Sequence, residues 1–346
     1  MEGRLAVSLI SFARVACLLA VFWGLGGSAV AQVVITASSW LPPTHALSEA
    51  QKEWCTLLER KTSGKARCQV LARPLSSPAG TFDAVRTGQV DLAFTAHRLT
   101  PGRFVGAQMA EFPFLGDGAE AVSVGFQRSL ARTPALLDEH KGVKLLAVFA
   151  QGPGVAFNTR RALLRWDDLL LLKWRADAGA PFELGKALGL NVTATAPTES
   201  YELLTTGIMD GTLFPAEAVE SFKIDRLVRH ATTFPGGLYN TSYAFVLNAA
   251  RYEALPAEVR QVVDELSGEF AARLFGQAWD RADRRGLAYL QASGVVFTKA
   301  DAAMVKAVSE RTTGWVDAWA RAAEAKGLKD PKKALADLRA EIARVR

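Results

Sequence analysis

One arginine in the chain stands where it could bind an anion. Arg175 ends a predicted strand, and the flexible stretch 176–180 follows it. A guanidinium group presents a planar fork of N–H donors, which can meet a carboxylate with two parallel hydrogen bonds. The same spacing also allows a local ion pair with Asp177, which would give Arg175 a structural role only. Position alone leaves both interpretations open.

Further candidates follow the other predicted strands. In open parallel sheets, ligands bind in the crevice beyond the carboxyl ends of the strands, so the residues just after each strand are the ones to consider. Besides Arg175, these residues are Trp40, His45, His97, Gln151, Pro197, Phe214 and Tyr239. The aromatic residues Trp40, Phe214 and Tyr239 are suited to the apolar walls of a ligand pocket, but a core position is an equally good interpretation for each.

The histidines do not form a catalytic set. The sequence has four of them, and none falls in a nucleophile-elbow, zinc-protease or phosphate-loop motif. His45 has no obvious nucleophile beside it. In the turn Gly152-Pro153-Gly154, the proline removes an amide donor that a phosphate loop would need. The sequence therefore argues against an enzyme, and it predicts no catalytic residues, no metal site and no cofactor.

Strands and helices alternate in the order that builds a parallel α/β sheet. Strands are predicted at 33–39, 66–72 and 90–95, with helices at 48–62 and 81–87 between them. Further strands are predicted at 143–149, 156–158, 172–176, 192–195 and 243–248. This repeated alternation predicts an α/β protein that is long enough for two domains.

A long helical pattern runs over 256–292. Gly268, Gly276 and Gly286 fall inside it, and each glycine weakens a helix by about 1 kcal/mol relative to alanine. An unbroken helix of this length exceeds the width of one small domain, because each residue adds about 1.5 Å. We therefore expect this helix to lie across two domains.

The first 31 residues have the form of a cleavable secretory signal. Arg4 and Arg14 precede an apolar run, and an A-x-A pattern ends at Ala31. This order predicts a signal peptide at 1–31, cleavage after Ala31 and export to the periplasm. The alternative is a membrane anchor, but the apolar run is short for a span of about 20 residues. No other stretch is apolar enough to embed the chain in a membrane.

Two cysteines, Cys55 and Cys68, lie beyond the predicted signal peptide. In an oxidising compartment they are expected to form a disulfide, although two free buried thiols remain the alternative. The formal net charge is +6, which is compatible with an anionic ligand. The basic residues are scattered and no arginine–aromatic cluster occurs, so nucleic acid is not an expected partner.

Four stretches of the chain resemble the solute-binding proteins of tripartite ATP-independent periplasmic (TRAP) transporters, the DctP-type family. They are AVRTGQVDLAF at 84–94, LTPGRFVGAQMAEFPFL at 99–115, DDLLLLKWRAD at 167–177 and PTESYELLTTGIMDGTLFP at 197–215. A strand at 243–248 followed by Leu255-Pro256 resembles the family's return strand and the start of its long helix. The resemblance extends over nearly the whole chain after the signal peptide. The joint order and spacing of these stretches make it specific.

The resemblance implies a fold and a function. The fold is a two-lobed α/β clamshell of the periplasmic-binding-protein type, with the helix 256–292 spanning both lobes. Lobe 1 would comprise 32–150, completed by about 239–266, and lobe 2 would comprise 151–238, completed by about 280–346. The function is the binding subunit of an ion-driven uptake transporter, which delivers a small organic acid to membrane permease subunits. Presentation of the ligand to a sensory receptor is the alternative.

The resemblance also assigns roles to single residues. Arg175 occupies the position of the family's arginine for the ligand carboxylate. Three positions depart from the family pattern, with Leu171 in place of a glycine, Gly154 in place of a frequent second arginine, and Phe214 in place of an asparagine. Loss of one charge and one amide, with gain of an aromatic ring, favours a less polar ligand. An aromatic or branched monocarboxylate or a keto acid is therefore expected.

Overall fold

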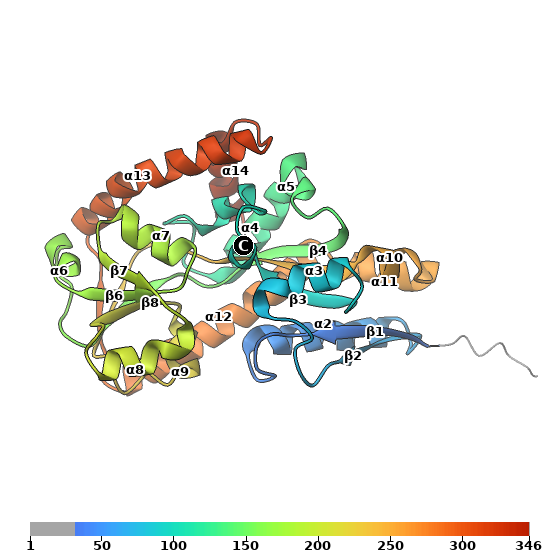
Figure 1. Cartoon of the computed structure of the whole chain (residues 1–346), viewed down its shortest axis with the longest axis horizontal. Coiled ribbons are helices and arrows are strands. Elements are labelled where there is room, and N and C mark those ends of the chain that lie inside the picture. The colour runs from blue at the N-terminus through green and yellow to red at the C-terminus, as the bar shows by residue number, and fades with distance from the viewer. Residues whose placement is uncertain (1–31, 346) are drawn as a thin grey trace, which may run out of the picture.

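The computed structural model describes residues 32–345, so the predicted signal peptide 1–31 and its cleavage site after Ala31 lie outside the described residues. The chain folds into two lobes, each built on its own β-sheet with helices on both faces (Figure 1). We call the lobe with the five-stranded sheet lobe 1 and the lobe with the six-stranded sheet lobe 2. The expected two-lobed α/β fold is confirmed.

The sheet of lobe 1 has the strand order β2-β1-β3-β10-β4. Strands β1, β2 and β3 are parallel, and β10 runs antiparallel between β3 and β4. Every residue of β3 and β10 is buried, as expected of central strands covered on both faces. The strands are β1 (Val33–Ser38), β2 (Ala66–Val70), β3 (Leu92–Ala96), β4 (Val143–Ala150) and β10 (Ser242–Asn248). The helices of this part of the chain are α2 (Ala46–Lys61), α3 (Thr81–Arg86), α4 (Ala119–Ala131), α5 (Pro134–Asp138), α10 (Ala249–Glu253), α11 (Ala257–Glu265) and the 3-10 helices η1 (Pro78–Gly80), η2 (His97–Leu99) and η3 (Gly106–Glu111).

The sheet of lobe 2 has the strand order β11-β9-β5-β8-β6-β7. Strand β6 pairs in parallel with both β7 and β8, which places the carboxyl ends of all three at one edge. The strands are β5 (Val155–Asn158), β6 (Lys173–Ala176), β7 (Asn191–Ala194), β8 (Gly211–Phe214), β9 (His230–Thr233) and β11 (Val296–Lys299). The helices are α6 (Trp166–Leu170), α7 (Ala180–Ala187), α8 (Ser200–Thr205), α9 (Ala216–Ser221) and the 3-10 helix η4 (Pro197–Glu199).

Two segments that connect the sheets lie side by side. Residues 151–154 lead from β4 to β5, and residues 234–241 lead from β9 back to β10. They are joined by backbone hydrogen bonds from Gln151 N to Thr241 O (2.9 Å) and from Gly154 N to Tyr239 O (2.8 Å). A paired two-segment connection of this kind is where a clamshell bends, because it crosses between lobes without belonging to either sheet.

The expected single helix over 256–292 is instead two helices, α11 and α12 (Glu269–Ala292). The break falls at Gly268, whose φ is +63° and whose N–H donates to Leu146 O at 2.6 Å. Glycine adopts this left-handed conformation without the steric penalty of a side chain, so the residue that the pattern marked as a weak point ends one helix and starts the next.

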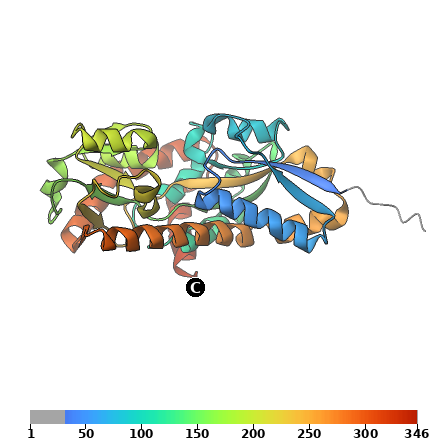
Figure 2. The same cartoon turned by 90° about the horizontal axis from the view of Figure 1, so that it is seen from below.

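Helix α12 nevertheless spans both lobes. Its 24 residues extend over about 36 Å, and it packs on α2, α4 and β4 of lobe 1 and on α9 of lobe 2. Figure 2 shows it running beneath the two lobes. A Cβ atom at Gly276 would lie 2.6 Å from Glu120 Cα, and one at Gly286 would lie 2.5 Å from Ala216 O. These two glycines therefore let the helix approach one helix of each lobe closely.

The C-terminal helices differ from the expectation that 280–346 complete lobe 2. Helix α13 (Ala302–Ala325) contacts α6 and α7 of lobe 2, and its Trp319 indole donates to Val105 O of lobe 1 at 2.8 Å. Helix α14 (Pro331–Ala343) packs on α4 of lobe 1. There, Gly125 leaves room for Ile342, since a Cβ at 125 would lie 2.5 Å from Ile342 Cγ1. The apolar stripe of α14 therefore completes lobe 1.

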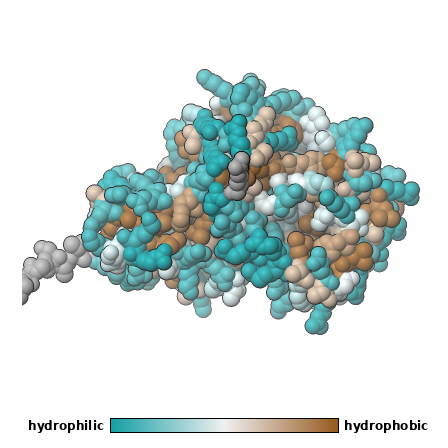
Figure 3. All heavy atoms as spheres, turned by 180° about the vertical axis from the view of Figure 1, so that it is seen from behind, coloured by the Kyte–Doolittle hydropathy of each residue, from teal (hydrophilic) through white to brown (hydrophobic). Residues whose placement is uncertain are grey.

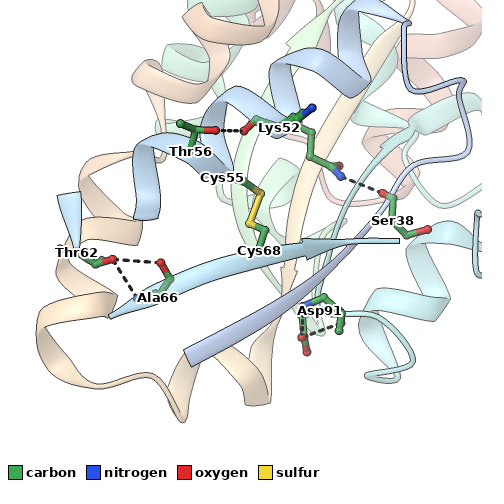
Figure 4. Close-up of a disulfide and its surroundings, with 10 residues drawn as sticks. Ser38, Lys52, Cys55, Thr56, Thr62, Ala66, Cys68 and Asp91 are labelled. Atoms are coloured by element: carbon green, nitrogen blue, oxygen red, sulfur yellow. Dashed lines mark hydrogen bonds between the residues drawn. A yellow bond between two sulfur atoms is a disulfide. The ribbon is translucent and has the colours of Figure 1, made fainter. Parts of the chain in front are cut away.

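A disulfide joins Cys55 of α2 to Cys68 of β2, with the two Cα atoms 5.5 Å apart. Figure 4 shows the bond between the helix and the neighbouring strand. The predicted pairing is thus present. It connects segments that are already adjacent in lobe 1 and lies apart from the lobe boundary.

The surface of the described residues mixes apolar and hydrophilic side chains (Figure 3). From behind, apolar residues form patches separated by hydrophilic ones (Figure 3). Within residues 32–345, no helix combines the length and the apolar character that crossing a membrane requires.

Candidate ligand-binding site

Arg175 lies at the carboxyl end of β6 with its side chain 0% exposed. Its Nε donates to Thr195 Oγ1 (3.3 Å), and its Nη2 donates to Thr195 O (2.7 Å) and pairs with the Asp177 carboxylate. Nη1 is buried and has no hydrogen-bond partner among residues 32–345. A buried donor without a partner is costly, by about 1–3 kcal/mol and more when the group is charged. The free Nη1 is therefore where an anion would be bound most strongly.

The guanidinium group is cationic, and its contacts with Thr195 and Asp177 hold it in place. Burial lowers the pKa of Arg175, while the Asp177 carboxylate opposes that change. The group remains protonated, because arginine does not lose its proton in proteins. The guanidinium carbon lies 4.3 Å from the centre of the Phe214 ring, within range of a cation–π interaction. Phe214, on the adjacent strand β8, thus lies against the guanidinium group.

Tyr239 is a second aromatic residue near Arg175. It lies on the connecting segment 234–241 and is buried, and burial is the main cause that raises the pKa of its hydroxyl well above the usual value. A Cβ atom at Gly154 would lie 2.0 Å from Tyr239 Cε1. The tyrosine ring therefore occupies the space that a side chain at position 154 would need. Where the family often has an arginine side chain, this protein has the uncharged Tyr239 ring.

The site lies at the boundary of the two lobes. Arg98 of η2 comes from lobe 1, and its Nη2 is 3.9 Å from Asp177 Oδ2 of lobe 2. Its aliphatic stem lies against Gly179, where a Cβ atom would be 2.9 Å from Arg98 Cβ. Gly179 also has a φ of +95°, so any other residue there would be strained as well as crowded. Asp177 thus stands between two arginines, one from each lobe.

A second contact between the lobes is made at α12. His45, at the N-terminus of α2, places its Nε2 3.7 Å from Glu217 Oε1 of α9 and its ring 5.5 Å from the Trp279 ring. Asp283 of α12 accepts a hydrogen bond from Glu217 N at 2.9 Å. Burial, followed by the nearby carboxylates of Glu217 and Asp280, raises the pKa of Asp283 to about 7. This cluster is rich in carboxylates and is unsuited to an anion.

Two hollows in the surface do not compete with this site for an anionic ligand. One of about 320 Å³ adjoins α12 and is lined by Asp117, Asp280 and Asp283 with Arg284 as its one cation. The other, of about 790 Å³, lies on the outside of lobe 1 between α4 and α14. Its lining alternates basic and acidic residues, several of which already pair with one another, as Glu341 does with Arg132.

The remaining sequence candidates come from three different segments of the chain. Trp40 packs on lobe 1, where its Nε1 donates to Phe94 O at 3.3 Å. Gln151 belongs to the connecting segment and its carbonyl accepts from Asn240 Nδ2 at 2.9 Å. Pro197 begins η4, two residues after Thr195. Among the described residues, no hydrogen bond or ion pair joins Trp40, Gln151 or Pro197 to Arg175, so their roles stay predictions.

His97 is part of a buried polar chain inside lobe 1. Its Nδ1 lies 2.9 Å from Ser242 Oγ and its Nε2 lies 3.0 Å from His140 Nε2. Burial lowers the pKa of both histidines, that of His140 to about 4. No group of three or more potential metal-ligating side chains occurs in the part of the chain that the structure covers.

Arg98 is a residue of the site that the sequence candidates left out. It follows β3 directly after His97, at the strand edge where the candidates were sought. Its position after a strand could therefore have identified it. Only His97 was chosen, but in a 3-10 turn two successive side chains point in different directions. His97 points into the core of lobe 1, whereas Arg98 reaches lobe 2.

The chain is similar in sequence to known bacterial solute-binding proteins. The family model described as bacterial extracellular solute-binding protein, family 7, matches residues 37–322. An outer membrane transporter protein, TsaT, of Comamonas testosteroni is 27% identical over 337 residues, which are 96% of this chain and 99% of that protein. The C4-dicarboxylate-binding periplasmic protein DctP of Rhodobacter capsulatus is 25% identical over 240 residues, 68% of this chain and 71% of that protein.

Solved structures agree with these relatives. A TRAP periplasmic solute-binding protein of Bordetella bronchiseptica with bound (R)- and (S)-mandelate is 41% identical, with a TM-score of 0.83, and the match covers 91% of this chain and 100% of that chain. A TRAP solute-binding protein of Rhodoferax ferrireducens, in complex with copurified benzoate, is 25% identical with a TM-score of 0.81, over 90% of this chain and 98% of that chain.

Proposed function

Since this chain belongs to the bacterial extracellular solute-binding proteins of family 7, and is a TRAP transporter binding protein of the DctP type, we propose that it captures an aromatic monocarboxylate on Arg175 and delivers it to membrane permease subunits. The family and the structural neighbours are periplasmic binding proteins of transport, not enzymes. Export through the predicted signal peptide, with cleavage after Ala31, is part of the proposal.

The observation that carries the proposal is the free Nη1 of Arg175 in a fully buried side chain. The other two nitrogens of the guanidinium group are held by Thr195 and Asp177, so the fork is fixed before a ligand arrives. A fixed donor favours binding because little side-chain freedom is lost when the ligand docks. A carboxylate on Nη1 would form a charge-assisted hydrogen bond in surroundings where water competes weakly.

The aromatic character of the ligand is supported by the two rings beside Arg175. Phe214 stacks on the guanidinium group, and Tyr239 fills the space next to Gly154. Apolar walls with a few polar groups are typical of small-molecule sites, and these walls would accept a ring more readily than a second carboxylate. The Bordetella bronchiseptica protein binds mandelate and the Rhodoferax ferrireducens protein binds benzoate, which are both aromatic acids.

Capture would proceed by closure of the two lobes. The ligand enters between them, and bending at the paired segments 151–154 and 234–241 brings Arg98 of lobe 1 onto the Asp177 side of lobe 2. Closure excludes water from the carboxylate, which strengthens its interaction with Arg175. The closed form then presents the surface that the membrane subunits would recognise.

The test is a titration calorimetry panel on the purified mature protein. Benzoate, mandelate and phenylglyoxylate represent aromatic acids, branched 2-oxo acids represent aliphatic monocarboxylates, and succinate represents dicarboxylates. The proposal predicts that an aromatic monocarboxylate binds most tightly. Preference for succinate over every aromatic acid would refute it. Uptake by proteoliposomes holding the cognate permease subunits, dependent on this protein, would establish delivery.

A further inference from the structure

We propose that Arg98 of lobe 1 is a specificity-determining residue of the site, which binds the ligand carboxylate together with Arg175 of lobe 2 and so couples ligand charge to closure. This inference rests on the proposed function, because it assigns a second cation to the same ligand. Neither the family pattern noted above nor the sequence candidates point to position 98.

The position of Arg98 supports a role at the ligand. It lies just beyond the carboxyl end of β3, at the edge of the lobe 1 sheet that faces lobe 2. Its charge acts on the buried hydroxyls of Tyr239 and Tyr243, which lie on or next to the connecting segment. The cation is thus close enough to both tyrosines to act on them, and it lies 3.9 Å from Asp177 Oδ2 of lobe 2.

The hydrogen-bonding state of Arg98 matches that of Arg175. Its side chain is 17% exposed, and its Nε is buried without a partner in the described part of the chain. Both guanidinium groups therefore hold one unused buried donor, and both adjoin the same carboxylate of Asp177. Two such donors from opposite sides could each take one oxygen of a ligand carboxylate.

The charges explain why the ligand should carry a single carboxylate. Arg98, Asp177 and Arg175 together carry a net charge of +1, and Tyr239 and Tyr243 stay neutral because burial raises their pKa values. One ligand carboxylate neutralises the cluster. A second carboxylate would leave an unpaired negative charge in a largely buried site, which is strongly unfavourable. Gly154 supplies no further cation to receive it.

Because the two arginines belong to different lobes, a ligand that binds both would favour the closed form. Arg175 belongs to lobe 2 at every stage, whereas Arg98 reaches the site only when the lobes are together, with its stem against Gly179. A carboxylate bound by both arginines joins the lobes directly. An uncharged ligand of the same shape lacks that bridge, and a ligand shifts the open–closed equilibrium only by its difference in affinity for the two forms.

The test compares an acid with its amide in matched variants. Binding of mandelate and of mandelamide is measured by titration calorimetry for the wild type, Arg98→Ala and Arg98→Lys, and closure is measured by small-angle X-ray scattering. We expect Arg98→Ala to weaken mandelate by about 30-fold, as for loss of one partner of a desolvated charge pair, and to leave mandelamide within about twofold. Arg98→Lys should restore part of the loss, since it keeps the charge but not the fork.

Two further variants separate a ligand contact from a contact with Asp177 alone. In an Asp177→Asn background, Arg98→Ala should still weaken mandelate, because its effect runs through the ligand. The control is Arg86→Ala, which removes an exposed lobe 1 arginine that pairs with Asp83 away from the site, and it should bind mandelate as the wild type does.

Three results would overturn the inference. They are unchanged mandelate affinity in Arg98→Ala, an equal loss for mandelamide, or no loss in the Asp177→Asn background. If Arg175→Ala abolishes binding while Arg98→Ala does not, the proposed function stands and only this inference fails. If the wild type binds no aromatic acid at all, the proposed function fails, and this inference fails with it.

Discussion

Two of the contacts between the lobes carry opposite charges. On the side of Arg175, two arginines share one carboxylate, Asp177, and each has a buried donor to spare. At α12, the Glu217 carboxylate lies next to the imidazole of His45, and Asp283 accepts a hydrogen bond from Glu217 N. We call the first region the arginine side and the second the helix side.

The difference shows how one boundary serves two purposes. The arginine side has unused donors and an excess of positive charge, so it is suited to an anion. On the helix side, Asp283 joins α12 to lobe 2 through a hydrogen bond from Glu217 N at the start of α9. Its second oxygen, Oδ2, is a buried acceptor without a partner among the described residues, so the excess there is of acceptors and negative charge. Asp280 of α12 joins the helix to lobe 1, because it accepts hydrogen bonds from Ala119 N (2.6 Å) and Glu120 N (3.0 Å) of α4. The proposed ligand recognition and the attachment of α12 thus lie on different sides of the lobe boundary.

The largest effect is expected on the arginine side. Arg175→Ala should weaken binding of an aromatic acid by about 3–5 kcal/mol, because it leaves the ligand carboxylate and Asp177 without their buried cation. Titration calorimetry measures this loss. Arg160→Ala, which removes a half-exposed lobe 2 arginine paired with Asp210 at 2.7 Å, is the matched control and should bind normally. Equal affinity of Arg175→Ala and wild type, with both folded, would contradict the role of the arginine side.

The next effect concerns the packing of Tyr239 against Gly154. In Gly154→Ala the new methyl group would meet the Tyr239 ring at 2.0 Å, and the ring would have to move. Overpacking of this kind should lower stability by about 2 kcal/mol and weaken the binding of aromatic acids. Chemical denaturation and calorimetry report the two losses. The paired change Gly154→Ala with Tyr239→Phe tests shape alone, and it should not rescue stability because the ring stays.

A pH effect is expected on the helix side. The pKa of Asp283 is raised to about 7 in the fold, above the unfolded value near 4. Folding therefore favours the protonated form of Asp283. Its contribution to stability is complete below about pH 4 and is lost as the pH rises through about 7. Between pH 5 and 8 the loss should reach about 2–3 kcal/mol.

Asp283→Asn isolates this contribution, because asparagine keeps the acceptor for Glu217 N but does not ionise. Stability measured by urea denaturation at several pH values should fall less steeply in the variant. Glu111 and Glu139, whose pKa values burial also raises to about 7, keep part of the slope in both proteins. Parallel curves for wild type and variant would mean that Asp283 is ionised throughout and that the helix side is not as described.

The smallest effect is expected at His45. Its contact with Glu217 is 3.7 Å long, and the ring also meets Trp279 edge-on. His45→Gln should shift the open–closed balance by about 0.5 kcal/mol, since a single long polar contact contributes little. Small-angle scattering without ligand would detect more open protein. A loss in ligand affinity as large as that of Arg175→Ala would erase the distinction between the two sides.

Local patterns gave most of the fold. Alternating strand and helix patterns located the central strands, because buried β-branched and apolar runs bounded by turns have few other interpretations. The patterns missed the end of α11, since a glycine inside a helical pattern either breaks the helix or permits close packing. Gly268 does the first, whereas Gly276 and Gly286 do the second, and only the partners in space decide between them.

The site was partly predictable for the same reason. Arg175, Phe214 and Tyr239 follow strands and do come together, as strand ends at one sheet edge must. The pair with Asp177, which sequence could offer only as an alternative, exists alongside the free Nη1. Arg98 was missed because its partner lies in the other lobe. No periodic pattern within one segment records a contact that forms only when two lobes meet.

The most direct test of the central claim is a crystal structure with mandelate bound. We predict that the ligand carboxylate accepts a hydrogen bond from Arg175 Nη1 at about 2.8 Å, with the aromatic ring against Phe214 or Tyr239. A carboxylate bound on the helix side, or in contact with neither Arg175 nor Arg98, would contradict the account.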